Sequence, residues 1–182
     1  WRMAPERIES MVLASGVPGR IMATIGVVAG AARMALLGAR TMRASGTAFS
    51  AALSQLVGTR PVTRVARALR LVGRNADVTM EHAALLLSSD PAVFWRIVER
   101  LHEHDASAWL GDIDVPVLIL HGDNDVLTPV RSGREMRVRI PGSEMHVFGG
   151  CTHAVVLEFP ERVVRHVRDF LARRLPPLGD VH

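Results

Sequence analysis

The stretch VPVLILHGDNDVLTP, residues 115–129, decides the fold. Residues 115–122 form a largely apolar run of strand length, which is typical of a parallel strand covered on both faces. Asp123 and Asp125 follow this run directly. The stretch therefore places two carboxylates just beyond the carboxyl end of a buried strand, where parallel α/β sheets bind their ligands.

The residues after Asp125 predict a helix, a strand and a second helix. Residues 128–140 have a helical pattern in which Thr128 fits the N-cap and Pro129 the first helical position. Residues 143–149 predict a short strand and residues 159–175 an amphipathic helix. The side chains of this last helix expected to face the core are Phe159, Val163, Val164, Val167, Phe170 and Leu171. Strands that alternate with helices predict a parallel α/β sheet.

A long helical segment precedes these units. Residues 8–14 predict another short strand, and the pattern is helical from there to the buried run at 115–122. We therefore expect a core strand segment at 1–16, a helical cap or lid at 17–110, and a C-terminal α/β core at 111–182. An insertion of this length between sheet strands is usually a lid over a site.

One helix of the predicted cap carries an arginine stripe. Residues 59–74 place Val62, Val65, Ala66, Leu69 and Val72 on one helical face. Another face carries Arg60, Arg64, Arg67, Arg70 and Arg74. We interpret the stripe as the solvated outer face of a cap helix; the alternative is a surface that binds anionic ligands or a membrane.

A second cap segment, residues 21–39, resembles a membrane span in its apolar content and its Gly26-x-x-x-Gly30 spacing. Arg33 would then lie within the bilayer, at a cost of roughly 2.5–3.5 kcal/mol. The Ala and Gly content of the segment also contributes little transfer free energy. The sequence therefore favours a helix packed within a protein or over its pocket.

The composition excludes several classes of protein. The chain has 182 residues, 48% of them hydrophobic and 22% charged, as in a soluble globular domain. Its single cysteine, Cys151, excludes an internal disulfide framework and favours a reducing compartment, so we expect a cytoplasmic protein. The net charge is only +4, and the arginines are not interleaved with aromatic residues, which argues against nucleic-acid binding. No metal-ligand spacing or phosphate-binding glycine loop occurs, so no cofactor is implied.

A histidine follows the next predicted strand. His153 lies in the loop GGCTH, between the strand at 143–149 and the final helix. Neighbouring parallel strands end at the same side of a sheet, so Asp125 and His153 are expected to meet there. Because Thr128 fits the helix cap, Asp125 is free for another role. A carboxylate that accepts the imidazole N–H makes the other ring nitrogen a general base.

These residues resemble the C-terminal part of an α/β-hydrolase-fold enzyme. Residues 112–129, DIDVPVLILHGDNDVLTP, and residues 140–171, IPGSEMHVFGGCTHAVVLEFPERVVRHVRDFL, carry the resemblance. The family pattern has an apolar strand, Gly-x-x-Asp, a helix start at Thr-Pro, Gly-x-x-His and Glu-x-Pro-Glu. The resemblance implies that Asp125 is the catalytic acid and His153 the catalytic base, whereas Asp123 matches a variable position. The order of acid before histidine also fits the family.

The nucleophile of such an enzyme is missing from the chain. Serine hydrolases place it in a Gly-x-Ser-x-Gly elbow between a strand and a helix, and no serine here has that context. Cys151 follows Gly149 by two residues but stands in the histidine loop, where a small filler is expected. The chain begins with Trp1, and residues 4–15 resemble the strand after the nucleophile helix. We therefore expect the nucleophile upstream or on a partner chain, and the isolated chain to be inactive.

Several functions remain open at this stage. The leading hypothesis is a serine hydrolase that acts on a small hydrophobic carboxylic ester or a related acyl substrate. Members of the same fold use an aspartate nucleophile on epoxides or haloalkanes, or act as lyases or haloperoxidases, and the deciding residue is absent. The alternative of another class is a truncated or split chain that works through a partner at its open sheet edge.

Overall fold

The architecture comes from a computed structural model. It describes residues 3–19, 55–57, 59–88, 93, 96–97, 100–101 and 103–175. Within these residues three strands form one sheet in the order β1-β2-β3. They are β1 (Met11–Ala14), β2 (Val117–Gly122) and β3 (Glu144–Phe148). Both pairings are parallel, with Leu13 opposite Ile119 and Ile119 opposite Met145. The predicted parallel α/β sheet is confirmed.

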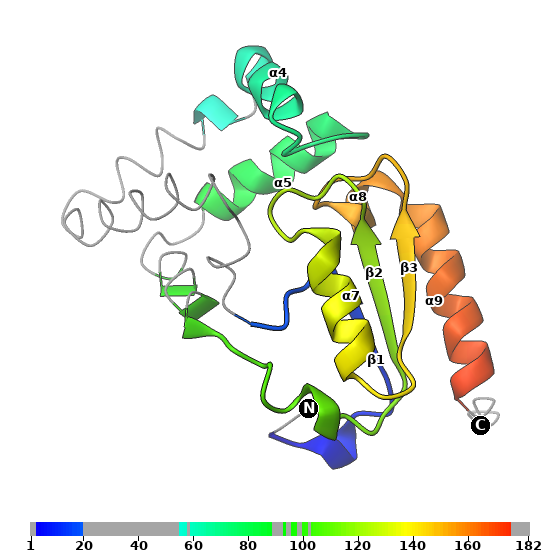
Figure 1. Cartoon of the computed structure of the whole chain (residues 1–182). Helices are drawn as coiled ribbons and strands as arrows, with labels where there is room; N and C mark the ends of the chain where they lie inside the picture. Colours follow the sequence, from blue (N-terminus) through cyan, green and yellow to red (C-terminus); the bar gives the residue numbers. More distant parts are fainter. Residues whose placement is uncertain are drawn as a thin grey trace, which may run out of the picture.

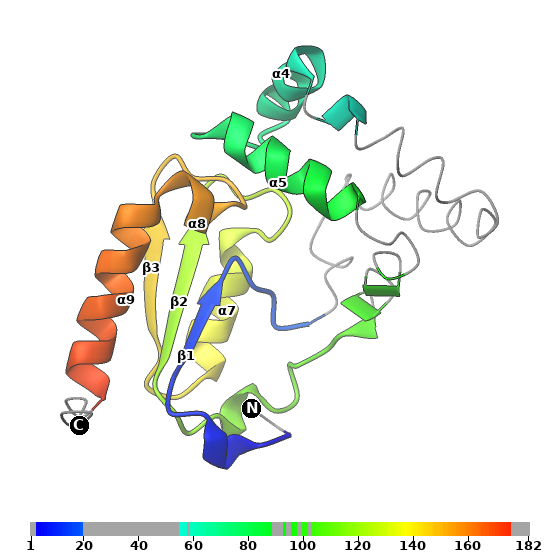
Figure 2. The same ribbon diagram turned by 180° about the vertical axis from the view of Figure 1, so that it is seen from behind.

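Two helices cover opposite faces of this sheet. Side chains alternate along β2, so Val117 and Ile119 pack with residues of α7 (Val130–Arg139), and Leu118 and Leu120 pack with those of α9 (Pro160–Arg174). Every residue of β2 is buried, as expected for a strand covered on both faces. Figures 1 and 2 show α7 and α9 flanking the strands from the two sides.

The remaining elements lie around the ends of the strands. The short helix α8 (Val155–Glu158) follows the loop after β3. Helices α4 (Arg60–Ala68) and α5 (Ala76–Ser88) lie beyond the carboxyl ends of the strands, where α5 contacts α8 (Figure 1). Single 3₁₀ turns, η1 (Pro5–Arg7) and η2 (Leu110–Asp112), lie at the opposite end of the sheet (Figure 2). The predicted division into core and cap remains a prediction.

Two predicted helix faces need correction. Helix α4 ends at Ala68, and Arg70 has a left-handed backbone with φ 57°. The chain turns there, and Val65 and Leu69 are exposed although Ala66 and Val72 are buried. In α9, Val164 is also exposed, because it lies about 100° around the helix from the buried Val163. The other five side chains of the predicted α9 stripe pack in the core: Phe159, Val163, Val167, Phe170 and Leu171.

The predicted segment 21–39 lies outside the described residues. Across the part of the chain that is described, no helix combines the length and the apolar character that crossing a membrane requires.

A pair of stacked histidines between β3 and α9 predicts acid-sensitive stability. The rings of His146 and His166 lie 3.7 Å apart between centroids. Burial lowers the pKa of His146, and the charges of His166 and Arg162 lower it further below 6.5. The unfolded chain therefore binds the proton more readily than the folded one, so this group lowers the free energy of unfolding as pH falls below about 6.5 and leaves it unchanged above.

Urea unfolding across this pH range tests the prediction. The substitution His146→Phe should flatten the acid dependence of the free energy of unfolding. The matched control is His82→Phe on the exposed surface of α5 and should leave the dependence in place. If the free energy of unfolding depends on pH in the His146 variant as it does in the wild type, His146 is not the source of the acid sensitivity.

Candidate active site

Asp125 closes the turn that leaves β2. Its Oδ1 accepts hydrogen bonds from the N–H groups of Leu127 at 2.9 Å and Thr128 at 2.7 Å. The carboxylate therefore shapes its own loop, which is a common use of aspartate in turns. These bonds occupy one oxygen, and Oδ2 is left to face the neighbouring loop.

His153 meets this second oxygen. The imidazole Nδ1 lies 3.0 Å from Asp125 Oδ2. A carboxylate can only accept, so Nδ1 carries the proton and the lone pair remains on Nε2. The Asp125 side chain is fully buried, whereas 40% of the His153 side chain is exposed. The arrangement therefore holds an oriented imidazole with one nitrogen available as a base.

The charge of Asp125 is stabilised despite its burial. Burial alone would raise the pKa of this carboxyl, but hydrogen bonds from His153 and from the hydroxyl and N–H of Thr128 outweigh it. The pKa of Asp125 consequently lies below its usual value. The group is ionised at neutral pH, as a partner that stabilises an imidazolium must be.

Thr128 belongs to this site and does not cap the next helix. Helix α7 begins at Val130, its N-cap is Pro129, and no side chain caps it. The Thr128 hydroxyl instead lies 2.6 Å from Asp125 Oδ2, 2.9 Å from the carbonyl of Ser15 and 3.1 Å from His153 Nδ1. The predicted cap is therefore wrong, because the carboxylate beside Thr128 is the stronger acceptor.

Ser15 joins the end of β1 to both loops, a role that the sequence did not indicate. Its hydroxyl donates to the carbonyl of His153 at 2.7 Å, and its own carbonyl faces Thr128. The residue has a left-handed backbone with φ 49°. Its hydroxyl contacts the backbone of His153 and not the imidazole, so this contact does not make Ser15 a nucleophile.

Asp123 has a structural role in the same region. Its Oδ1 accepts hydrogen bonds from the N–H groups of Gly150 at 2.8 Å and Cys151 at 3.3 Å. The carboxylate thereby ties the turn after β2 to the loop that leads to His153. The two aspartates after the strand thus have different roles, since Asp123 holds the loop before His153 and Asp125 contacts the imidazole.

His121, at the end of β2, is a second histidine near the site, and it is fully buried. Its Nε2 donates to the carbonyl of Gly16 at 3.1 Å, and a Cβ on Gly133 would lie 2.5 Å from its ring. Burial lowers the pKa of His121, although the negative charge of Asp125 acts to raise it. The ring is therefore a neutral packing element that joins β2 to the loop after β1.

Cys151 is buried in the histidine loop. Burial raises the pKa of its thiol to about 12, and the charges of Glu158, Asp125 and Asp123 contribute to the rise. Thiolate is the reactive form, and at about pH 8 it would be roughly 1 in 10⁴ of the molecules. The residue is thus a loop filler and not a nucleophile.

We predict that Cys151 in the folded chain reacts with a disulfide reagent such as Ellman's reagent much more slowly than in urea. The fully buried side chain and the raised pKa both oppose reaction. Comparing the reaction rate in native buffer with that in denaturant checks this. A native rate near that of a free thiol would contradict the assignment.

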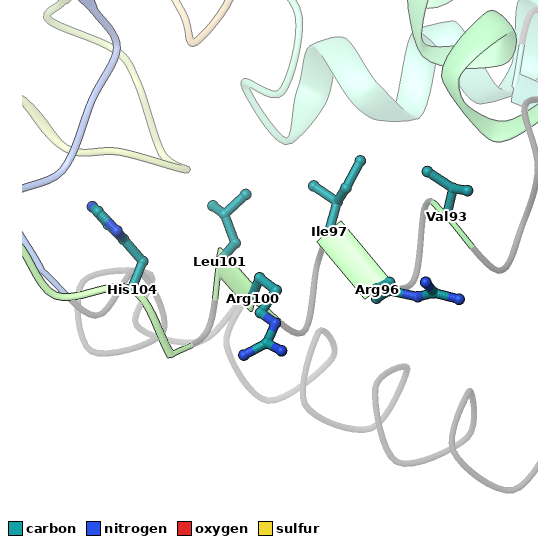
Figure 3. Close-up of a pocket in the computed structure, with 6 residues that line it drawn as sticks. All are labelled: Val93, Arg96, Ile97, Arg100, Leu101 and His104. Carbon is teal, nitrogen blue, oxygen red and sulfur yellow. The ribbon is translucent and has the colours of Figure 1, made fainter. Parts of the chain in front are cut away.

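An apolar groove lies along the segment from Val93 to His104. It has a volume of about 430 Å³ and is lined by Val93, Arg96, Ile97, Arg100, Leu101 and His104. Figure 3 shows Val93, Ile97 and Leu101 projecting to one side, and Arg96 and Arg100 turned away from it. Asp125 and His153 are not among the lining residues.

Comparisons with known proteins agree with this architecture. Residues 81–160, which include Asp125 and His153, match the family model of the alpha/beta hydrolase fold. A pimeloyl-[acyl-carrier protein] methyl ester esterase of Nitrosomonas europaea is 36% identical over 74 residues, which is 41% of this chain and 29% of that protein. A 2-hydroxy-6-oxo-2,4-heptadienoate hydrolase of Pseudomonas putida is 38% identical over 82 residues, 45% of this chain and 29% of that protein.

Solved structures show the same fold. A thermophilic esterase from Thermogutta terrifontis aligns with a TM-score of 0.66 at 19% identity, covering 96% of this chain and 60% of that one. A hydrolase from Pseudomonas aeruginosa aligns with a TM-score of 0.65 at 22% identity, covering 92% and 57%. The chain therefore has the α/β-hydrolase fold, and its residues 81–160 are similar to the family of that name. The matched part of the chain spans less than a third of the length of each of the esterase of Nitrosomonas europaea and the hydrolase of Pseudomonas putida.

Proposed function

We propose that this chain supplies the acid and the base of a hydrolase that cleaves small hydrophobic carboxylic esters or related acyl compounds. The observation that carries the proposal is the 3.0 Å contact between His153 Nδ1 and the buried carboxylate of Asp125. Esterases among the relatives and structural neighbours support the substrate class.

In the proposed reaction His153 moves two protons. Its Nε2 takes the proton of a nucleophile hydroxyl as that oxygen attacks the ester carbonyl, and returns it to the leaving alcohol. It then takes a proton from water as the water oxygen attacks the acyl-enzyme carbonyl, and it returns that proton to the nucleophile oxygen as the acid is released. Asp125 stabilises the imidazolium that forms in each step.

The nucleophile is proposed to come from a segment or partner outside these residues. Strand β1 pairs only with β2 among the described strands, and Val12 is exposed. Such an edge can accept a further strand. The solved neighbours are longer than this chain, which covers 60% of the Thermogutta terrifontis esterase. The turn after that further strand would carry the nucleophile. A serine there would give an esterase, and an aspartate would direct the chemistry to epoxides or haloalkanes.

The test compares two proteins in hydrolysis of a p-nitrophenyl ester and in labelling by a fluorophosphonate. One is the 182-residue chain alone, and the other is the product of the coding sequence including any reading frame that continues upstream. The proposal expects both signals from the longer product and neither from the chain alone. Turnover by the chain alone that His153→Ala abolishes would overturn the placement of the nucleophile. A longer product without hydrolysis would favour a non-catalytic role through a partner.

A further inference from the structure

A buried glutamate lies directly behind the catalytic loop, and the proposed reaction does not use it. Glu158, the last residue of α8, is only 4% exposed. Its carboxylate accepts hydrogen bonds from the N–H of Thr152 at 3.3 Å and from the Thr152 hydroxyl. It also accepts the N–H of Arg74 at 3.2 Å. A carboxylate so enclosed by fixed donors is suited to holding backbone in place and not to proton transfer.

These contacts join two segments that are far apart in the sequence. Thr152 immediately precedes His153, whereas Arg74 lies in the connection between α4 and α5. The side-chain amide of Asn75 donates to the carbonyl of Leu157 at 2.8 Å, and the Arg74 guanidinium lies 5.2 Å from the centre of the Phe159 ring. The connection is therefore docked on Leu157 and Glu158 of α8 and on Phe159, which directly follows that helix.

Close approach of the backbone makes this docking possible. A Cβ on Gly73 would lie 2.5 Å from Oε2 of Glu158, closer than real Cβ contacts allow. The backbone of Gly73 has no positive φ, so an alanine there would be opposed by the carboxylate and not by its own conformation. Gly73 is thus the point at which the connection closely approaches the carboxylate that binds Thr152 in the histidine loop.

His153 is held from both sides as a result. Glu158 binds the N–H of Thr152, the residue before His153, and the Ser15 hydroxyl donates to the carbonyl of His153 at 2.7 Å. A shift of Glu158 would move the backbone on which the imidazole is mounted. Since the imidazole must keep its 3.0 Å contact with Asp125, a small movement there changes its orientation.

We propose that Glu158 is a positioning residue that couples the Gly73–Asn75 connection to the orientation of the His153 imidazole. The proposal rests on the proposed role of His153 as the base. Through Glu158, a displacement of the α4–α5 connection changes the orientation of the His153 imidazole without direct contact. The coupling gives the predicted cap a direct mechanical link to the catalytic loop.

The test substitutes the remote side of the link in the full chain. Gly73→Ala should change the ¹⁵N shifts of the His153 imidazole in NMR, and accelerate amide exchange of Thr152 about tenfold, as loss of one charged hydrogen bond implies. The matched control is Gly149→Ala, four positions before His153, where a Cβ would meet nothing within 4 Å. It should leave both readouts unchanged.

Two further variants keep the test decisive. Glu158→Gln keeps the side-chain volume but removes one acceptor, and should accelerate exchange of the Thr152 and Arg74 amides together. Adding Glu158→Asp to Gly73→Ala withdraws the carboxylate by one methylene and should restore part of the wild-type His153 spectrum. If the Gly73 variant folds with an unchanged His153 signal, or if Glu158→Gln leaves Thr152 exchange unchanged, the proposal fails.

These readouts separate the two proposals. If Gly73→Ala changes the His153 shifts but ester hydrolysis survives His153→Ala, the proposed function alone is rejected. If Gly73→Ala leaves the His153 shifts unchanged in a protein that requires His153 for hydrolysis, the positioning role of Glu158 alone is rejected.

Discussion

Replacing His153 with alanine in the form of the protein that hydrolyses esters is expected to lower kcat about 10⁶-fold, as loss of the base does in serine hydrolases. The imidazole is the group whose free nitrogen can accept the nucleophile's proton in the proposed reaction. The side chain is 40% exposed, so its removal leaves little cavity, but the buried Asp125 carboxylate loses a hydrogen-bond donor and the thermal midpoint should fall by several degrees. Steady-state kinetics and a melting curve on the same preparation give both quantities.

The matched control for this variant is His82→Ala. His82 is exposed on α5, and its ring Nδ1 lies 2.9 Å from the carbonyl of Val78 in the same helix. Its removal should leave kcat within a few-fold of wild type. A His153 variant that retains a tenth of the wild-type kcat would exclude His153 as the general base.

Asp125→Asn is expected to lower kcat about 10⁴-fold while the fold persists. An asparagine Oδ1 can still accept the N–H groups of Leu127 and Thr128. Its amide nitrogen, however, would face His153 Nδ1 and donate to it, so the imidazole proton moves to Nε2 and the base is lost. We expect the free energy of unfolding to fall by only about 1–2 kcal/mol.

Asp123→Asn serves as the control for this second variant. Its Oδ1 can still accept the N–H groups of Gly150 and Cys151, and its side chain does not contact His153. We expect kcat within about tenfold of wild type. Equal losses in the two variants would mean that loop geometry, and not the tautomer of His153, explains the role of Asp125.

The central part of the fold was predictable from local patterns. The apolar run at 115–122 and the strand at 143–149 appear as β2 and β3, and parallel pairing brings the loops after them together. The meeting of Asp125 with His153 follows from that topology alone. It needed no knowledge of side-chain packing, because neighbouring parallel strands end on the same side.

Contacts between distant segments could not be predicted in this way. Ser15 is 138 positions from His153, and Arg74 is 84 positions from Glu158. No periodicity links such pairs. Thr128 was assigned to the helix cap because its sequence context fits that role, yet the carboxylate of Asp125 competes for its hydroxyl. The side chains that support Asp125 and His153 are therefore the ones that sequence patterns do not reveal.

The most direct test of the central claim is the tautomer of His153 in the folded chain. NMR of ¹⁵N-labelled imidazole near neutral pH distinguishes a protonated Nδ1 from a protonated Nε2. We predict a proton on Nδ1, hydrogen-bonded to Asp125, that is lost from this position in Asp125→Asn. A proton on Nε2 in the wild-type chain, or a spectrum that Asp125→Asn leaves unchanged, would contradict the proposal that these two residues form the acid and base of a hydrolase.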